Sequence, residues 1–145
     1  MLLHHFTSSQ HLKAILRQGL TMGRVPSHFD SNDRPYFISG YQWLTANPDF
    51  EQAWARPHAF SYLPYRRNQI RLFIDIPFHA QSRLIRWADF SAKYRLQAAD
   101  FINSFPDAVH WKLFHGSIPP AWIVAADSNP TPIDLQFNEA PKISG

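Results

Sequence analysis

Residues 2–20 read LLHHFTSSQHLKAILRQGL, and this stretch decides how the chain begins to fold. An apolar run over 2–6 predicts a strand, and Ser8 or Ser9 then supplies a hydroxyl that can cap a helix. From about residue 10 the apolar residues recur at helical spacing. Gly19 follows them at the position where a helix ends in a left-handed conformation. The chain therefore opens as a strand, a turn and a helix.

Two adjacent histidines stand inside the first predicted strand. Side chains alternate between the two faces of a strand, so His4 and His5 point in opposite directions. If Leu3 faces the core, His5 shares its face. A cleft at the end of this strand can therefore receive only one of the two imidazoles, and a hydrogen-bonded strand residue is the simpler interpretation of either.

The next part of the chain is irregular in pattern. Turn-forming residues dominate 21–35, so we predict a long loop there. Aromatic and branched residues over 36–45 predict a strand that ends at Trp43-Leu44-Thr45. A helix is then expected to start after Asn47-Pro48 and to end at Pro57.

Strict alternation makes 69–77 the clearest strand of the chain. Beyond it we predict a short strand over 84–87, one helix or two short ones within 88–105, a strand over 109–116 and a final core strand over 121–127. This order predicts an α+β domain over 1–127 with a mixed or antiparallel split sheet flanked by short helices. Residues 128–145 are predicted to form a proline-rich surface tail.

Composition limits the classes of function. The chain has 145 residues, no cysteine, a formal net charge of +3 and a pI of about 9.4. The basic balance favours polyanionic partners. No segment has the length and apolar character of a membrane span or a secretion signal, so we expect a cytoplasmic protein without membrane partners. The eight histidines are scattered, and we predict no metal site.

Three blocks of sequence, taken in their order, suggest a family. They are HFTSSQHLKAILRQGL at 5–20, YQWLTANPDFEQAW at 41–54 and LFHGSIPPAWI at 113–123. Together they resemble the ADP-ribosyltransferase superfamily, above all its small His-type members, which include DNA-modifying toxins and the poly-ADP-ribose polymerase catalytic domains. The resemblance implies an ADP-ribosyltransferase-like fold and NAD as substrate. It also implies transfer to a macromolecular acceptor, nucleic acid or protein, in a toxin, defence or counter-defence factor of a phage or mobile element.

The resemblance also assigns roles to individual residues. It implies that His5 contacts the ribose hydroxyls of NAD, that Thr7 lies near the nicotinamide amide, and that Trp43 packs on the nicotinamide ring with Thr45 completing the strand end. Segment 21–35 takes the place of the donor loop. The remaining implied contacts are Arg24 with the pyrophosphate and Trp54 as the far wall of the pocket.

The expected catalytic carboxylate is the point at which this chain departs from the family. The family's glutamate corresponds to His110, and no glutamate lies between Glu51 and Glu139. Asp107 or His110 could take its catalytic role, with His110 as a base. On the resemblance to the superfamily, an ADP-ribosyltransferase is the favoured interpretation of the chain.

Two other functions remain open. One is a non-catalytic basic protein that binds nucleic acid or inhibits a nucleic-acid-binding machine. The other is a ribonuclease that uses His5 together with His110 or His115 as acid and base.

Overall fold

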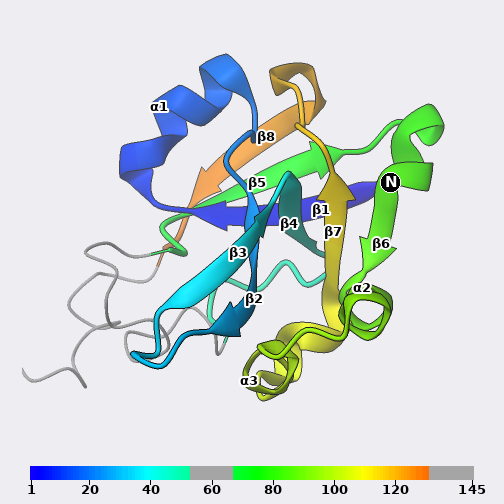
Figure 1. Ribbon diagram of the computed structural model, residues 1–145. Helices are drawn as coiled ribbons and strands as arrows, with labels where there is room; N and C mark the ends of the chain where they lie inside the picture. Colours follow the sequence, from blue (N-terminus) through cyan, green and yellow to red (C-terminus); the bar gives the residue numbers. More distant parts are fainter. Residues whose placement is uncertain (53–66, 131–145) are drawn as a thin grey trace, which may run out of the picture.

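A single antiparallel sheet organises the fold. The computed structural model describes residues 1–52 and 67–130. Within them, six strands are hydrogen-bonded in the order β6-β7-β4-β1-β5-β8, and β2 and β3 form a separate hairpin (Figure 1). The strands of the sheet are β1 (Leu2–Thr7), β4 (Tyr41–Thr45), β5 (Ile70–Asp75), β6 (Leu84–Arg86), β7 (Trp111–His115) and β8 (Ile123–Ser128).

Short helices flank the sheet. The helices are α1 (Ser9–Gln18), α2 (Trp87–Tyr94) and α3 (Ala99–Asn103), with 3-10 turns η2 (Phe78–Arg83), η3 (Pro106–His110) and η4 (Pro120–Trp122). The α+β class and the antiparallel sheet are thus as predicted. The expectation of one helix or two within 88–105 is resolved as two short helices that overlap this range.

The strands β1 and β5 pair along six register positions. Alternation places Leu3, Leu72 and Ile74 on one face, where each side chain is at most 2% exposed. Helix α1 packs on this face through Leu12 and Ile15. Burial of this apolar surface is the main stabilising term for this half of the molecule.

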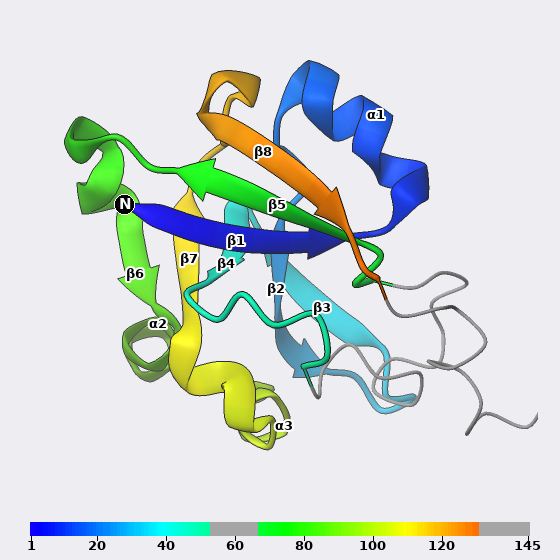
Figure 2. The ribbon, with the colours of Figure 1, turned by 180° about the vertical axis from the view of Figure 1, so that it is seen from behind.

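The sheet is split between β1 and β4. These two central strands share a single register pair, His4 with Thr45. On one side of the split, β1, β5 and β8 run together, and on the other side β4, β7 and β6 cross them (Figures 1 and 2). Strands that diverge after one pair leave backbone groups without ladder partners, which side chains or ordered water can satisfy.

The end of α1 is fixed by a glycine. Gly19 has φ +83, and its amide donates to the Ile15 carbonyl. A Cβ at this position would lie 2.0 Å from the Ile118 carbonyl oxygen. The next residue, Leu20, exchanges both backbone hydrogen bonds with Ile118. Glycine is therefore required where the helix returns the chain to the sheet.

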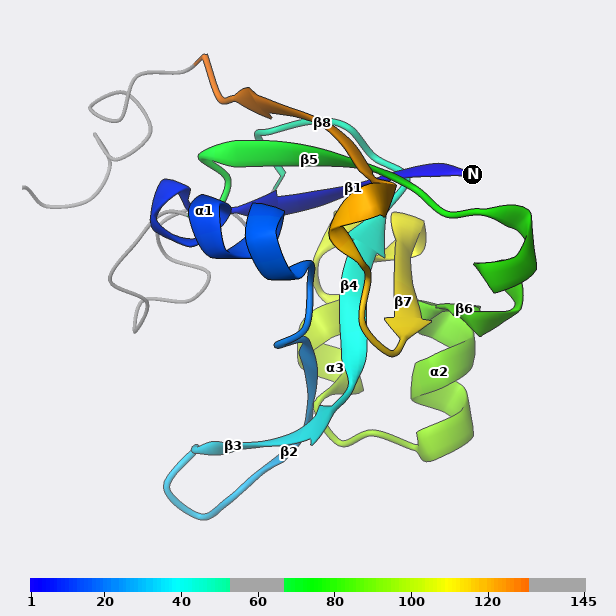
Figure 3. The same cartoon turned by 90° about the horizontal axis from the view of Figure 1, so that it is seen from above.

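The expectation of a long loop over 21–35 is wrong. This segment contains strand β2 (Arg24–Phe29), which pairs with β3 (Pro35–Ser39) in a hairpin that projects from the body of the molecule (Figure 3). A bulge near Pro26 lets a proline sit in the strand. The Asp30 carboxylate closes the turn by accepting from the amides of Asn32 and Arg34. The turn-forming residues of this segment interrupt the alternation of apolar and polar residues that would have indicated a strand.

Three further expectations need correction. The predicted strand within 36–45 is two strands, β3 and β4, which Gly40 separates. The predicted helix after Asn47-Pro48 does not start there, because residues 48–52 are irregular, and the rest of it lies outside the described residues. The predicted core strand over 121–127 starts at Ile123 as β8, which lies at the sheet edge with Val124 to Ser128 exposed.

A second apolar cluster covers the opposite face of the β4–β7 half. It is built on Val25 of the hairpin, Trp87 and Phe90 of α2, Ile102 of α3 and Leu113 of β7. All five side chains are at most 3% exposed. The hairpin and the two helices are therefore held against the same half of the sheet.

Candidate functional site

A cavity of about 610 Å³ lies where β1 and β4 diverge. The predicted cofactor residues that the structure describes all line it: His5, Thr7, Arg24, Trp43 and Thr45. They come from β1, β2 and β4. The split of the sheet thus brings together side chains that lie up to 40 positions apart in the sequence. Trp54, the predicted far wall, lies outside the described residues.

His5 takes the place of a ladder hydrogen bond at the split. Its Nδ1 lies 2.7 Å from the Trp43 carbonyl oxygen. A carbonyl can only accept, so Nδ1 carries the hydrogen and donates it. Burial lowers the pKa of His5, although the hydrogen bond to Trp43 partly opposes this effect. The imidazole is therefore neutral near pH 7, and its Nε2 is an acceptor.

His4 occupies the opposite face of β1, as alternation predicts. Its ring packs edge-on against Phe73 with ring centres 5.0 Å apart, and the side chain is 7% exposed. Burial and the nearby Arg71 cation both lower its pKa. Its Nδ1 has no hydrogen-bond partner among the described residues. Both His4 and His5 line the cavity, so the expectation that only one of them could reach it is wrong, because the cavity lies where β1 separates from β4. His4 packs on Phe73, whereas His5 is oriented by a hydrogen bond.

Trp43 forms a rigid part of the cavity wall. Its indole N–H donates to the Arg24 carbonyl over 2.9 Å, which joins β4 to the hairpin. Its ring centre lies 5.3 Å from those of both Trp87 and Trp111. Aromatic packing and a hydrogen bond together fix the orientation of the indole.

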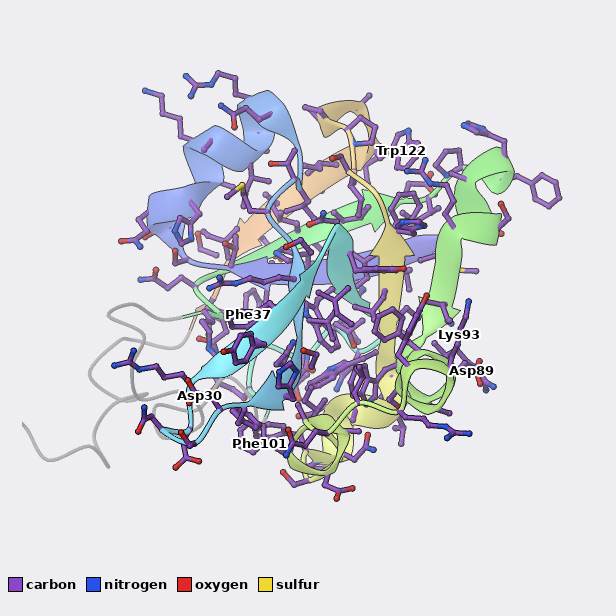
Figure 4. The ribbon with its side chains drawn as sticks, in the orientation of Figure 1. Asp30, Phe37, Asp89, Lys93, Phe101 and Trp122 are labelled. Carbon is purple, nitrogen blue, oxygen red and sulfur yellow. The ribbon has the colours of Figure 1, made fainter. Side chains whose placement is uncertain are left out.

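Cationic and aromatic groups from the hairpin and from other segments form a further part of the cavity wall. The Arg24 guanidinium lies 4.0 Å from the ring centre of Phe37, and Arg67 also lines the space. Phe37 of β3 and Phe101 of α3, both labelled in Figure 4, line the cavity from the hairpin and from α3. The cavity thus offers positive charge together with aromatic surface.

Two buried threonines line the cavity. Thr7 and Thr45 are 7% and 4% exposed. The Thr45 hydroxyl accepts from the Asn47 amide at 3.0 Å, so it helps to turn the chain after β4. Thr45 therefore has a structural contact besides its place on the wall.

Of the predicted catalytic residues, His5 lines the cavity, whereas Asp107 and His110 lie apart from it. Asp107 and His110 belong to η3, and neither is among the residues that line the cavity. The His110 side chain is exposed, while its carbonyl accepts from the Ala46 amide. The following residue, Trp111, opens β7 and lines the cavity. Among the described residues that line the cavity, Asp33 is the only one with a carboxylate side chain. Asp33 lies in the turn of the β2–β3 hairpin, where its backbone φ is 60°.

Several lining residues were missed by the sequence interpretation. Ser8 and His11 reach the cavity from the start of α1, and Phe105 and Trp111 reach it from either end of η3. The close spacing of Ser8 and His11 to His5 was a usable signal. No sequence pattern connected η3 to the cavity.

In comparisons with known proteins, no family model, curated protein or solved structure matches the chain. Among residues 1–52 and 67–130, no group of three or more potential metal ligands is found. In the same residues, no helix has the length and apolar character needed to cross a membrane.

Proposed function

We propose that the cavity binds NAD and that the protein is an ADP-ribosyltransferase with a macromolecular acceptor. The single observation that carries the proposal is the convergence of His5, Thr7, Arg24, Trp43 and Thr45 on one cavity. These are the residues to which the sequence resemblance assigns contacts with NAD. The same resemblance is our reason to propose an ADP-ribosyltransferase-like fold, and the split sheet is compatible with it.

The chemistry of the wall suits the parts of NAD. The acceptor Nε2 of His5 can take a hydrogen bond from a ribose hydroxyl. The flat cationic nicotinamide ring suits stacking on the Trp43 indole. Arginine is the preferred side chain for a pyrophosphate, and Arg24 and Arg67 line the cavity.

The proposed reaction breaks the bond between nicotinamide and the ribose C1. Nicotinamide leaves as a neutral amide with the bonding electron pair, and positive charge develops on the ribose ring. A nearby anion or dipole would stabilise this charge. The resemblance would place a glutamate directly before β7, but this chain has His110 there, as the last residue of η3, with an exposed side chain. Asp33 is the carboxylate that the described cavity wall provides.

Release of nicotinamide from NAD tests the proposal. The purified protein is incubated with NAD alone, with nucleic acid and with protein extract, and free nicotinamide is quantified. The proposal predicts release that is strongly reduced in His5→Ala and Trp43→Ala. Matched controls are His79→Ala and Trp122→Ala, because these residues do not line the cavity.

The outcomes separate the remaining candidates. NAD binding without release or transfer would favour a non-catalytic binding protein, since the expected carboxylate is missing. Neither His110 nor His115 lines the cavity with His5, and His115 stacks on Tyr41 with ring centres 4.7 Å apart. The geometry therefore gives the ribonuclease interpretation no support. Absence of both NAD binding and nicotinamide release would refute the proposed activity.

A further inference from the structure

Five aromatic side chains form a continuous wall along the cavity. All of them are among the lining residues, and each ring contacts the next. In the order of these contacts, the aromatic wall consists of Trp43, Trp111, Phe105, Phe101 and Phe29. The centres of neighbouring rings lie 5.3, 6.2, 5.6 and 6.5 Å apart. The wall therefore runs from β4 at the split of the sheet, past both ends of η3, to α3 and the hairpin.

The aromatic wall is longer than one ligand ring requires. The proposed function places nicotinamide on Trp43, which is separated from Phe101 by the rings of Trp111 and Phe105. Aromatic rings attract one another when their centres lie about 4.5–7 Å apart, so a single ligand ring contacts only the side chains next to it. The end of the wall that Phe101 and Phe29 form is thus left to a different group.

Hydrogen bonds from backbone amides hold this end of the wall in place. The Phe29 amide donates to the Gln97 side-chain oxygen over 3.2 Å, and the Ala98 amide donates to the Ser27 carbonyl over 3.0 Å. Both bonds join the hairpin to the residues that precede α3. The Phe101 ring, which is labelled in Figure 4, meets the Phe29 ring edge to face at 89°. The two rings are therefore positioned together before any ligand binds.

The exposure of Phe101 also indicates a ligand. This large apolar side chain is 42% exposed, although it lines a cavity and packs on a half-buried neighbour, Phe29. Apolar surface that remains in water is unfavourable, and a flat ligand on the ring would cover it. Aromatic side chains presented in this way are typical of stacking platforms for nucleobases.

The charges on the cavity wall indicate the class of flat ligand. Arg24 and Arg67 line the cavity, and Asp33 is the only carboxylate among the described lining residues. The positive balance favours an anionic ligand. A nucleotide combines a flat base for the aromatic wall with a phosphate for the arginines. An aromatic side chain of a protein brings no such anion.

We propose that Phe101 and Phe29 form a second stacking subsite of the cavity, which binds the base of a nucleotide. This inference rests on the proposed function, because that function assigns Trp43 to the nicotinamide ring. Two sources supply a base with the same chemistry. One is the adenine of NAD itself, and the other is a base of a nucleic-acid acceptor.

Calorimetric titration with the two halves of NAD tests the subsite. Adenosine monophosphate carries a base and a phosphate, and nicotinamide mononucleotide carries the other ring. We expect Phe101→Ala to weaken binding of adenosine monophosphate by about tenfold through loss of one stacked ring. The Kd for nicotinamide mononucleotide should stay within about twofold. Phe101→Tyr keeps a ring and should bind both ligands as the wild type does.

The matched control is Phe78→Ala. Phe78 is 89% exposed and does not line the cavity, so its truncation should leave all affinities unchanged. The urea midpoint of each variant shows whether it is folded.

NAD and a single-stranded deoxyadenosine oligonucleotide distinguish the two sources of the base. If Phe101→Ala weakens binding of NAD and leaves that of the oligonucleotide unchanged, the subsite holds the adenine of NAD. The reverse result assigns the subsite to a nucleic-acid acceptor.

Three results would overturn the inference. They are the absence of adenosine monophosphate binding to the wild type, equal affinity of the wild type and Phe101→Ala for it, and Phe101→Tyr binding as weak as that of Phe101→Ala. If the wild type releases nicotinamide and one of these results is found, only this inference fails. If the wild type binds adenosine monophosphate through Phe101 but neither binds NAD nor releases nicotinamide, the proposed function fails and a nucleotide-binding protein is left.

Discussion

The hydrogen bond between His5 and the Trp43 carbonyl leads to a prediction about stability. His5→Ala removes the donor of this 2.7 Å contact and leaves the carbonyl unsatisfied at the split. An unsatisfied buried acceptor costs about 1–3 kcal/mol, so we expect the free energy of unfolding to fall by about 2 kcal/mol. His5→Asn places an amide nitrogen close to the position of Nδ1. It should retain most of this stability while it removes the Nε2 acceptor.

Urea denaturation followed by tryptophan fluorescence measures the difference. Small proteins lose about 1–3 kcal/mol of stability per molar urea, so His5→Ala should lower the midpoint by about 1 M. The midpoint of His5→Asn should lie much closer to that of the wild type. Equal midpoints for the wild type and His5→Ala would refute the reasoning, because the Trp43 carbonyl would then not depend on the imidazole. A His5→Asn midpoint as low as that of His5→Ala would show that the amide does not replace the donor.

Three other predictions concern pH, the helix end and ligand charge. Burial lowers the pKa of His4 and of His5 below the ordinary value of 6.5, so the unfolded imidazoles protonate first and stability should fall as the pH drops below about 6.5. Urea midpoints at pH 7.5 and 5.5 should show this loss, with a smaller loss in His5→Asn; a flat profile would contradict it. Gly19→Ala should destabilise by more than about 1 kcal/mol, because φ +83 disfavours alanine and its Cβ would lie 2.0 Å from the Ile118 oxygen. An unchanged melting temperature would contradict the requirement for glycine at position 19. Arg24→Gln should weaken NAD binding by about tenfold and reduce its salt dependence, as expected for loss of a charge-assisted hydrogen bond. Unaltered calorimetric affinity would remove Arg24 from the phosphate site.

The sequence predicted those elements whose pattern was local and strong. The alternation over 69–77 and the strand, serine and helix order over 2–20 both correspond to observed elements. The hairpin of β2 and β3 was missed because Pro26 and the polar turn interrupt its alternation, although the bulge accommodates the proline. Residues 121–127 were predicted as a core strand because their apolar composition does not distinguish a central strand from an edge strand such as β8.

The candidate site could be predicted only in part, because contacts between residues far apart in the sequence bring its groups together. The resemblance selected residues on β1, β2 and β4 that the split brings to one cavity. It could not identify the Nδ1 partner of His5, because that partner is a backbone carbonyl 38 positions away. The contact between Ser8 and His11 was equally hidden, since a serine before a helix is ordinarily interpreted as a cap.

Calorimetric titration of NAD into the wild-type protein and His5→Asn tests the central claim most directly. The account predicts that the wild type binds NAD. His5→Asn, which its urea midpoint should show to be folded, is predicted to bind NAD about tenfold more weakly because one hydrogen bond is lost. No heat of binding with the wild type, or equal affinity in the two proteins, would contradict the claim that this cavity binds NAD through His5.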